Sequence, residues 1–255
     1  MPENIELPGP MKRLIPKQIK QPVKSALLAY IFRQAMRELA KLPPGEMPSR
    51  ELLKKLRLGW DNQGWDAKLD YFEEIARRAV TTEGPILECG SGLTTLVMGH
   101  LAGKRNVESW SLEHHTEWYG RVAKAIKQHH VRGVNLCLSP LRSYEGFNWY
   151  DPPLAKMPEK FSLVICDGPP DLANGGRYGL LPVLGNRLDP GTVILFDDAR
   201  EPGQPEVLQR WTKERGVRVE LRETDEVSFA LVTCPLYEFL LRINYHCRIN
   251  MIFGN

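Results

Sequence analysis

The stretch ILECGSGLTT, residues 86–95, decides the fold. Its apolar run at 86–89 predicts a short buried strand, and residues 93–102 continue as a helix. Gly90 and Gly92 lie between the two. Glycine allows the backbone to turn tightly and to approach a ligand, and the start of a helix offers unpaired N–H groups. The stretch therefore predicts a strand–turn–helix unit that binds a ligand at its turn, unless the glycines serve only the turn itself.

The same stretch also limits the kind of ligand. A dinucleotide-binding turn has three glycines in the pattern G-x-G-x-x-G, and here Thr95 holds the third position. Glu88 lies just before the turn, where a carboxylate would repel a pyrophosphate. These residues favour a ligand that presents hydroxyl groups and a positive charge over one that presents phosphates.

From Pro85 onward, short apolar segments alternate with helical ones. This alternation predicts a mainly parallel α/β sheet with helices on both faces. The short link RETDE between the last two strands predicts an antiparallel hairpin. The predicted strands are 86–89, 107–113, 134–138, 162–167, 192–197, 217–221 and 227–233, and the predicted helices are 93–102, 116–130, 178–187 and 204–215.

The remaining segments divide the chain into three parts. Residues 1–83 form an N-terminal extension, with an irregular proline-rich arm over 1–22 and a helix over 23–42, and Ser49 is placed to cap the next helix. Residues 84–234 form the sheet domain. The apolar tail 235–255 forms a closing helix or an oligomer contact. The turn GWDNQGWD, 59–66, packs the extension onto the sheet or covers a cofactor with Asn62 and Trp65.

Composition narrows the cellular setting. The chain is 42% hydrophobic and 25% charged, and its net charge of +3 does not indicate a nucleic-acid partner. Its five cysteines are scattered without C-x-x-C pairs, which favours a reducing, cytoplasmic location. The first residues do not read as a signal peptide. The longest early apolar run, ALLAYIF, is shorter than the roughly 20 residues that span a bilayer.

Glu113 ends the second predicted strand, in WSLEHH. An acidic residue about 20 residues after a glycine turn is the position that binds ribose hydroxyls in nucleotide-binding βαβ units. His114 and His115 follow it. Either histidine could flank an adenosine, and either could be an ordinary surface residue.

In this order, these motifs resemble the class I S-adenosylmethionine-dependent methyltransferases over residues 84–234. The resemblance implies a Rossmann-like, seven-stranded, mainly parallel sheet with an antiparallel last strand, and S-adenosylmethionine as cofactor. It also implies that the loop after the third strand flanks the adenine. The implied cofactor-binding residues are Glu88, Gly90, Ser91, Gly92, Thr94, Thr95, Glu113, His114, Ser139, Pro140, Leu141 and Asp167.

Three aspartates end two neighbouring predicted strands, Asp167 in ICDGPP and Asp197–Asp198 in LFDDA. Carboxylates that meet at one sheet edge repel unless a cation lies among them, and oxygen ligands suit Mg²⁺ or Ca²⁺. The pattern is similar to the divalent-metal site of catechol-type O-methyltransferases. The alternative is that one of Asp197 and Asp198 caps the turn while the other is solvated.

The catechol-type resemblance is incomplete, because Pro169, Pro170 and Asp171 stand where that family has a basic lysine. The segment DGPP…GGRYG also resembles the DGP…R segment of glycan-modifying methyltransferases. That resemblance implies that Arg177 anchors an anionic acceptor, unless it is a surface arginine. Asp167, Asp198 and Arg177 are therefore the expected catalytic residues.

The expected function is methyl transfer from S-adenosylmethionine to a hydroxyl or carboxyl of a small molecule or glycan, assisted by a divalent metal. Two alternatives stay open: an NAD-type oxidoreductase and a non-catalytic cofactor-binding module of the same fold. The expected self-contact is a homo-oligomer formed through the N-terminal helices or the tail.

Overall fold

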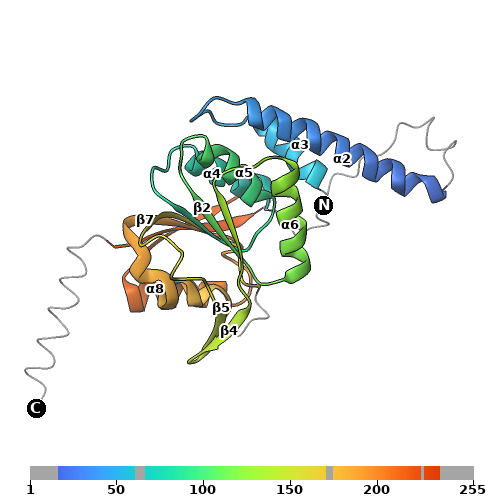
Figure 1. Cartoon of the computed structure of the whole chain (residues 1–255). Coiled ribbons are helices and arrows are strands. Elements are labelled where there is room, and N and C mark those ends of the chain that lie inside the picture. Colours follow the sequence, from blue (N-terminus) through green and yellow to red (C-terminus); the bar gives the residue numbers. More distant parts are fainter. Residues whose placement is uncertain (1–16, 61–66, 171–174, 225–226, 236–255) are drawn as a thin grey trace, which may run out of the picture.

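The computed structural model describes residues 17–60, 67–170, 175–224 and 227–235. A seven-stranded sheet has the order β3-β2-β1-β6-β7-β9-β8, and a separate hairpin joins β4 and β5 (Figure 1). The strands are β1 Ile86–Cys89, β2 Ser109–Glu113, β3 Val134–Leu138, β4 Leu141–Tyr144, β5 Phe147–Tyr150, β6 Phe161–Cys166, β7 Leu188–Phe196, β8 Arg218–Glu223 and β9 Ser228–Thr233.

Strand direction confirms the predicted fold class. The pairs β1–β2, β1–β6, β2–β3 and β6–β7 are parallel. The strand β9 is antiparallel to both β7 and β8, so the predicted terminal hairpin is confirmed as well. Parallel pairing brings the carboxyl ends of β1, β2, β6 and β7 to one edge of the sheet, where ligands bind in open α/β folds.

Helices cover the two faces of the sheet unequally (Figure 1). The helices are α2 Lys17–Lys41, α3 Arg50–Trp60, α4 Leu69–Ala79, α5 Leu93–Gly103, α6 Thr116–Gln128, α7 Leu180–Leu184 and α8 Gln204–Arg215, with 3-10 turns η1 Gly176–Gly179 and η2 Gly185–Arg187. In one core, the helices from α2 through α6 pack against one face of the sheet. The second core joins α7, α8, η1 and β5 with the other face.

The N-terminal extension is tied into the first core by packing and by capped helix ends. Ser49 Oγ accepts a hydrogen bond from the Leu52 amide at 3.2 Å, as the capping prediction requires. Lys104 Nζ, on the loop after α5, donates to the carbonyls of Leu39, at 3.0 Å, and Leu42. These contacts satisfy carbonyls at the end of α2 that have no partner within the helix.

Several predicted boundaries are wrong. The irregular arm predicted for 1–22 does not hold for 17–22, because α2 begins at Lys17 and includes Pro22. The strand β7 begins at Leu188 instead of 192. The short helical piece predicted near 178–187 is confirmed as α7 between two 3-10 turns. The β4–β5 hairpin was not predicted. Its strands are short, and its two-residue turn uses Gly146 at φ 84°.

Two predicted features lie outside the described residues: the cover formed by Asn62 and Trp65, and the tail from 236 onward. Among the helices that the structure describes, none combines the length and the apolar character needed to cross a membrane.

Candidate active site

A cavity of about 710 Å³ opens at the carboxyl ends of the parallel strands. It is lined by the turn after β1, by the end of β2 and by the residues that follow β6 and β7. The lining residues are Trp60, Ala67, Lys68, Phe72, Gly90, Ser91, Gly92, Leu93, Thr94, Glu113, His114, His115, Trp118, Tyr150, Asp167, Gly168, Pro170, Arg177, Asp197 and Asp198.

The glycine turn packs directly against the end of β6. Gly90 has φ 91°, and a Cβ on it would lie 3.4 Å from the carbonyl of Asp167. The backbone conformation favours glycine, because residues with side chains rarely adopt a φ in this range. The turn is closed by Thr95 Oγ1, which accepts a hydrogen bond from the Gly92 amide at 2.9 Å. The predicted ligand turn therefore forms one wall of the cavity.

Glu88 lies behind this turn and does not line the cavity. Its carboxyl accepts hydrogen bonds from the hydroxyls of Thr94, Thr95 (2.6 Å) and Ser111. Burial raises the pKa of Glu88 to about 7, while these three hydroxyls oppose the rise. Glu88 and Thr95, both predicted to bind cofactor, instead hold the turn in place from beneath.

Glu113 links the glycine turn to the end of β2. Its carboxylate accepts hydrogen bonds from the Ser91 amide at 3.2 Å, Ser91 Oγ at 2.7 Å and the His115 amide at 2.8 Å. The residue is buried but lines the cavity, as do His114 and His115. The structure thus brings together the predicted turn and the predicted ribose-binding carboxylate.

The predicted adenine loop does not line the cavity. Ser139, Pro140 and Leu141 are not among the lining residues. Ser139 donates its amide to the Glu113 carbonyl at 2.6 Å, and Leu141 opens the unpredicted strand β4. The β4–β5 hairpin carries Tyr150 into the cavity wall instead, so the site gains an aromatic residue that sequence reasoning missed.

Aromatic side chains form much of the remaining wall. Trp118 donates its indole N–H to the Ser91 carbonyl at 2.6 Å. The guanidinium of Arg121 lies over the rings of both Trp118 and Trp60, 4.8 Å from each ring centre. Tyr150 is buried, and its hydroxyl has no hydrogen-bond partner among the described residues. In the sequence, Tyr150 and Trp60 appear only within the segments FNWY, 147–150, and GW, 59–60. Those segments do not indicate that the side chains lie near the glycine turn.

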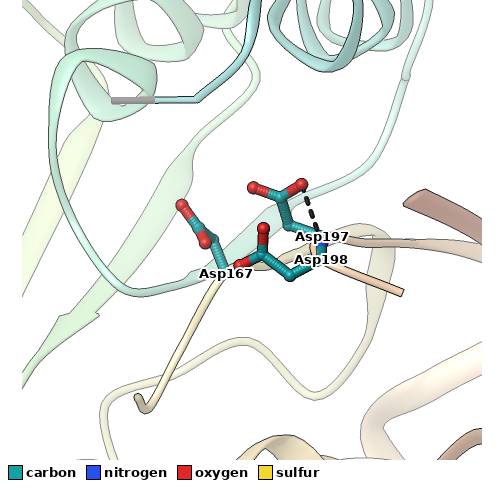
Figure 2. Close-up of side chains that lie close together, drawn as sticks. All are labelled: Asp167, Asp197 and Asp198. Carbon is teal, nitrogen blue, oxygen red and sulfur yellow. Dashed lines mark hydrogen bonds between the residues drawn. The ribbon is translucent and has the colours of Figure 1, made fainter. Parts of the chain in front are cut away.

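The three aspartates converge (Figure 2). One carboxylate oxygen from each of Asp167, Asp197 and Asp198 lies within 4.8 Å of the others. Asp198 has φ 53°, a left-handed conformation that is costly for a residue with a side chain. The Asp197 carboxylate accepts a hydrogen bond from the Asp198 amide at 2.9 Å. The three carboxylates therefore converge, and Asp197 also makes the turn contact that was predicted as the alternative.

Arg177 reaches into this cluster from η1 and is only 4% exposed. It donates to the Asp197 carbonyl at 2.9 Å, to Asp167 Oδ1 at 3.2 Å and to Asp198 Oδ2 at 2.9 Å. Both terminal nitrogens are therefore engaged within the protein. The anchoring of an anionic acceptor by Arg177 stays a prediction, and it would compete with these internal contacts.

Burial and mutual repulsion change how the aspartates ionise. Burial raises the pKa of Asp167 to about 6, while Arg177 opposes the rise. Burial, Asp167 and Asp198 raise the pKa of Asp197 well above its usual range. Like charges this close disfavour joint ionisation, so the cluster favours a proton on Asp197, while the nearby carboxylates keep Arg177 charged.

The donor set was tested for the predicted divalent metal. Carboxylate oxygens suit Mg²⁺, but the Arg177 guanidinium already contacts two of the three carboxylates and supplies the positive charge that the cluster requires. Each carboxylate has a second oxygen, but a cation bound by all three aspartates would lie beside this guanidinium and be repelled by it. The residues as arranged do not fit a resident metal.

Comparisons with known proteins agree with the fold. No family model and no curated protein matches the sequence. Among solved structures, the chain is similar to the O-methyltransferase from Bacillus cereus in complex with S-adenosylhomocysteine, with 13% identity, TM-score 0.51 and coverage of 73% of this chain and 92% of that one.

Two further structures show the same likeness. The S-adenosylhomocysteine-bound Podospora anserina methyltransferase PaMTH1 is 17% identical, with TM-score 0.51 and coverage of 85% and 96%. The precorrin-6y C5,15-methyltransferase from Geobacter metallireducens is 14% identical, with TM-score 0.50 and coverage of 67% and 91%. At this identity the likeness concerns the fold, and it shows that this chain has the Rossmann-like fold of these methyltransferases.

Proposed function

We propose that this protein is an S-adenosylmethionine-dependent methyltransferase that methylates a hydroxyl oxygen. One observation carries the proposal: a single cavity joins the glycine turn and Glu113 to the carboxylates at the ends of β6 and β7. A cofactor bound at the first pair would have its reactive end near the second. Two similar structures contain bound S-adenosylhomocysteine, which supports this choice of cofactor.

The half of the cavity near Glu113 has the chemistry that a nucleoside requires. A carboxylate can accept hydrogen bonds from two ribose hydroxyls, and it does not suit a pyrophosphate. Trp118 and His114 offer flat surfaces beside it. The buried Tyr150 hydroxyl offers a donor that no described residue uses. An adenosine group would satisfy these polar groups.

Charge in the cavity also suits this cofactor over an anionic one. The lining residues include four acidic side chains and two basic ones, Lys68 and Arg177. Even with Asp197 protonated, the lining keeps a net negative charge. A sulfonium is positively charged and is favoured there, whereas NAD carries a pyrophosphate. The same charge disfavours a carboxylate acceptor, so we narrow the predicted acceptor to a hydroxyl of a small molecule or glycan.

The aspartate cluster would remove the acceptor proton. The acceptor oxygen forms a bond to the methyl carbon, the carbon–sulfur bond breaks with its electron pair passing to sulfur, and the hydroxyl proton passes to a carboxylate. Asp198 is the best placed base, because its side chain is 45% exposed, the largest fraction among the three aspartates and Arg177. Arg177 holds Asp198 and Asp167 in position, and the enzyme otherwise aligns the two reactants.

Calorimetric titration tests the cofactor. S-adenosylhomocysteine should bind the full-length protein, and NAD should not. Glu113→Gln should weaken S-adenosylhomocysteine binding by at least about tenfold, since it removes a charged acceptor. Glu117→Gln is the matched control, because Glu117 is exposed on α6 and does not line the cavity. Binding of NAD without binding of S-adenosylhomocysteine would favour the oxidoreductase alternative.

A further inference from the structure

The N-terminal helices carry a charge that differs sharply from that of the rest of the chain. Residues 17–60 contain ten lysine and arginine residues against three glutamates, whereas the remaining residues contain 24 basic against 28 acidic ones. The one acidic residue of α2 is Glu38, whose Oε2 lies 3.7 Å from Nζ of Lys55 in α3. The small net charge of the whole chain therefore conceals a strongly basic extension.

The helix α2 has one side that faces the core and an opposite side that faces solvent. Leu28, Phe32, Ala35, Met36 and Leu39 face the core. On the opposite side, Val23, Leu27 and Tyr30 are 38%, 38% and 57% exposed. Their spacing of four and three residues places them on one face of a helix.

The same spacing continues along α2 into basic residues. Gln34, Arg37 and Lys41 extend the row begun by Val23, Leu27 and Tyr30, and all three are exposed. Arg33 is exposed one turn before Arg37. The outer face of α2 is thus apolar from Val23 to Tyr30. From Arg33 to Lys41 it carries three basic residues and the exposed Glu38, which pairs with Lys55 of α3.

The apolar half also extends beyond the body of the molecule. In Figure 1 the N-terminal half of α2 continues past α3 and α6. Nearly all described side chains from 21 to 27 are exposed, so the rest of the protein packs little against this part of α2. An exposed row of large apolar side chains is unfavourable in water and marks an interaction site.

We propose that the outer face of α2 docks this protein onto an anionic lipid bilayer. Phosphate headgroups would contact Arg33, Arg37 and Lys41. The side chains of Val23, Leu27 and Tyr30 would enter the headgroup–acyl boundary, where aliphatic side chains are buried and tyrosine is favoured. Each part of the face then meets the chemistry that suits it.

A second copy of the chain suits this face less well. Parallel pairing of two α2 helices would place Arg37 and Lys41 against the same residues of the other copy. Antiparallel pairing would place the apolar half against the basic half. Nucleic acid would pair with the basic residues but would leave Val23, Leu27 and Tyr30 in water. An anionic bilayer is therefore the occupant that both halves favour.

The test is co-sedimentation of the full-length protein with vesicles. The protein should bind vesicles containing phosphatidylglycerol, bind phosphatidylcholine vesicles weakly, and lose binding as salt rises. The triple variant Arg33→Gln, Arg37→Gln, Lys41→Gln should bind at least about tenfold less, because each basic residue near an anionic surface contributes roughly fivefold. The pair Leu27→Ser, Tyr30→Ser should also weaken binding.

The matched control removes three charges from the other side of the sheet. Lys213→Gln, Arg215→Gln and Arg218→Gln alter exposed residues of α8 and β8, and this variant should bind vesicles like the wild type. Circular dichroism and S-adenosylhomocysteine titration verify that each variant is folded. The proposal is overturned by equal binding to both kinds of vesicle, by an equal loss in the control, by binding to duplex DNA in place of vesicles, or by a dimer that Tyr30→Ser dissociates.

Discussion

Glu88 is a buried carboxyl, whereas the Asp167 side chain is 37% exposed at the cavity wall; the two lie in or just after neighbouring strands and have opposite surroundings. Glu88 lies within β1, where three hydroxyls donate hydrogen bonds to it and none of its partners among the described residues is a cation. Asp167 lies one residue beyond β6, where Arg177 and two further aspartates surround it. The neutral hydroxyls around Glu88 hold its carboxyl in a structural role. The Arg177 guanidinium favours the charged form of Asp167 at the cavity wall. Each of the following changes tests this contrast.

Arg177→Met should have the largest effect. It removes the guanidinium that contacts Asp167 and Asp198, which costs about 2–3 kcal/mol of the free energy of unfolding, less than for a fully buried pair because these side chains are 37% and 45% exposed. Urea denaturation at pH 7 measures the loss. Mg²⁺ should then stabilise the variant more than the wild type, because the three carboxylates become free to bind it. Equal stabilisation of both proteins by Mg²⁺ would show that the wild type binds the metal despite Arg177.

Asp198→Asn should lower kcat by at least about a hundredfold, as expected when a proton acceptor is removed. Glu88→Gln should leave kcat within a few-fold of the wild type, because Glu88 does not line the cavity. Turnover is measured as the release of S-adenosylhomocysteine with an acceptor found by screening hydroxyl compounds. A larger loss of kcat in Glu88→Gln than in Asp198→Asn would reverse the assignment of the two carboxyls.

The pH dependence of stability should carry the signature of Glu88. Its pKa is about 7 in the folded protein, compared with 4.5 for the free side chain. A carboxyl with a raised pKa retains its proton on folding, so its contribution is complete below pH 4.5 and declines as the pH rises through 7. The decline has a limit of about 3 kcal/mol.

His100 opposes this slope, because burial lowers its pKa to about 4 and stability rises with pH between 4 and 6.5. Urea titrations from pH 5 to 8 should therefore show that Glu88→Gln is relatively less stable than the wild type at low pH and relatively more stable at high pH. Parallel profiles for the two proteins would show that Glu88 does not titrate in this range.

Thr94→Val should have the smallest effect. It removes one of the three hydroxyls that hydrogen-bond to Glu88 and keeps the shape of the side chain. The expected loss is about 1 kcal/mol, seen as a shift in the urea midpoint. Because Thr94 also lines the cavity, titration with S-adenosylhomocysteine shows whether the hydroxyl serves the turn alone. A tenfold loss of affinity would assign Thr94 to the ligand.

The cofactor half of the candidate site was more predictable from sequence than the acceptor half. Gly90, Ser91 and Glu113 are fixed by local patterns, since each follows a recognisable strand at a set spacing. Ser139, Pro140 and Leu141 follow β3 as predicted but do not line the cavity, and their contact with adenine stays a prediction. Arg177 was identified, but its partners were not. Its contacts cross 10 and 21 residues, and no local pattern specifies which anion an arginine reaches.

The sequence by itself determined the strand–turn–helix unit, the alternation that makes a parallel sheet, and the presence of acidic residues at strand ends. These follow from propensity and periodicity, which act over a few residues. Only the tertiary structure decided which carboxyl became structural, that Arg177 takes the place expected for a metal, and that α2 exposes an apolar and a basic half on one face. Those outcomes depend on burial and on distances between segments far apart in the chain, and electrostatic energies change steeply with both.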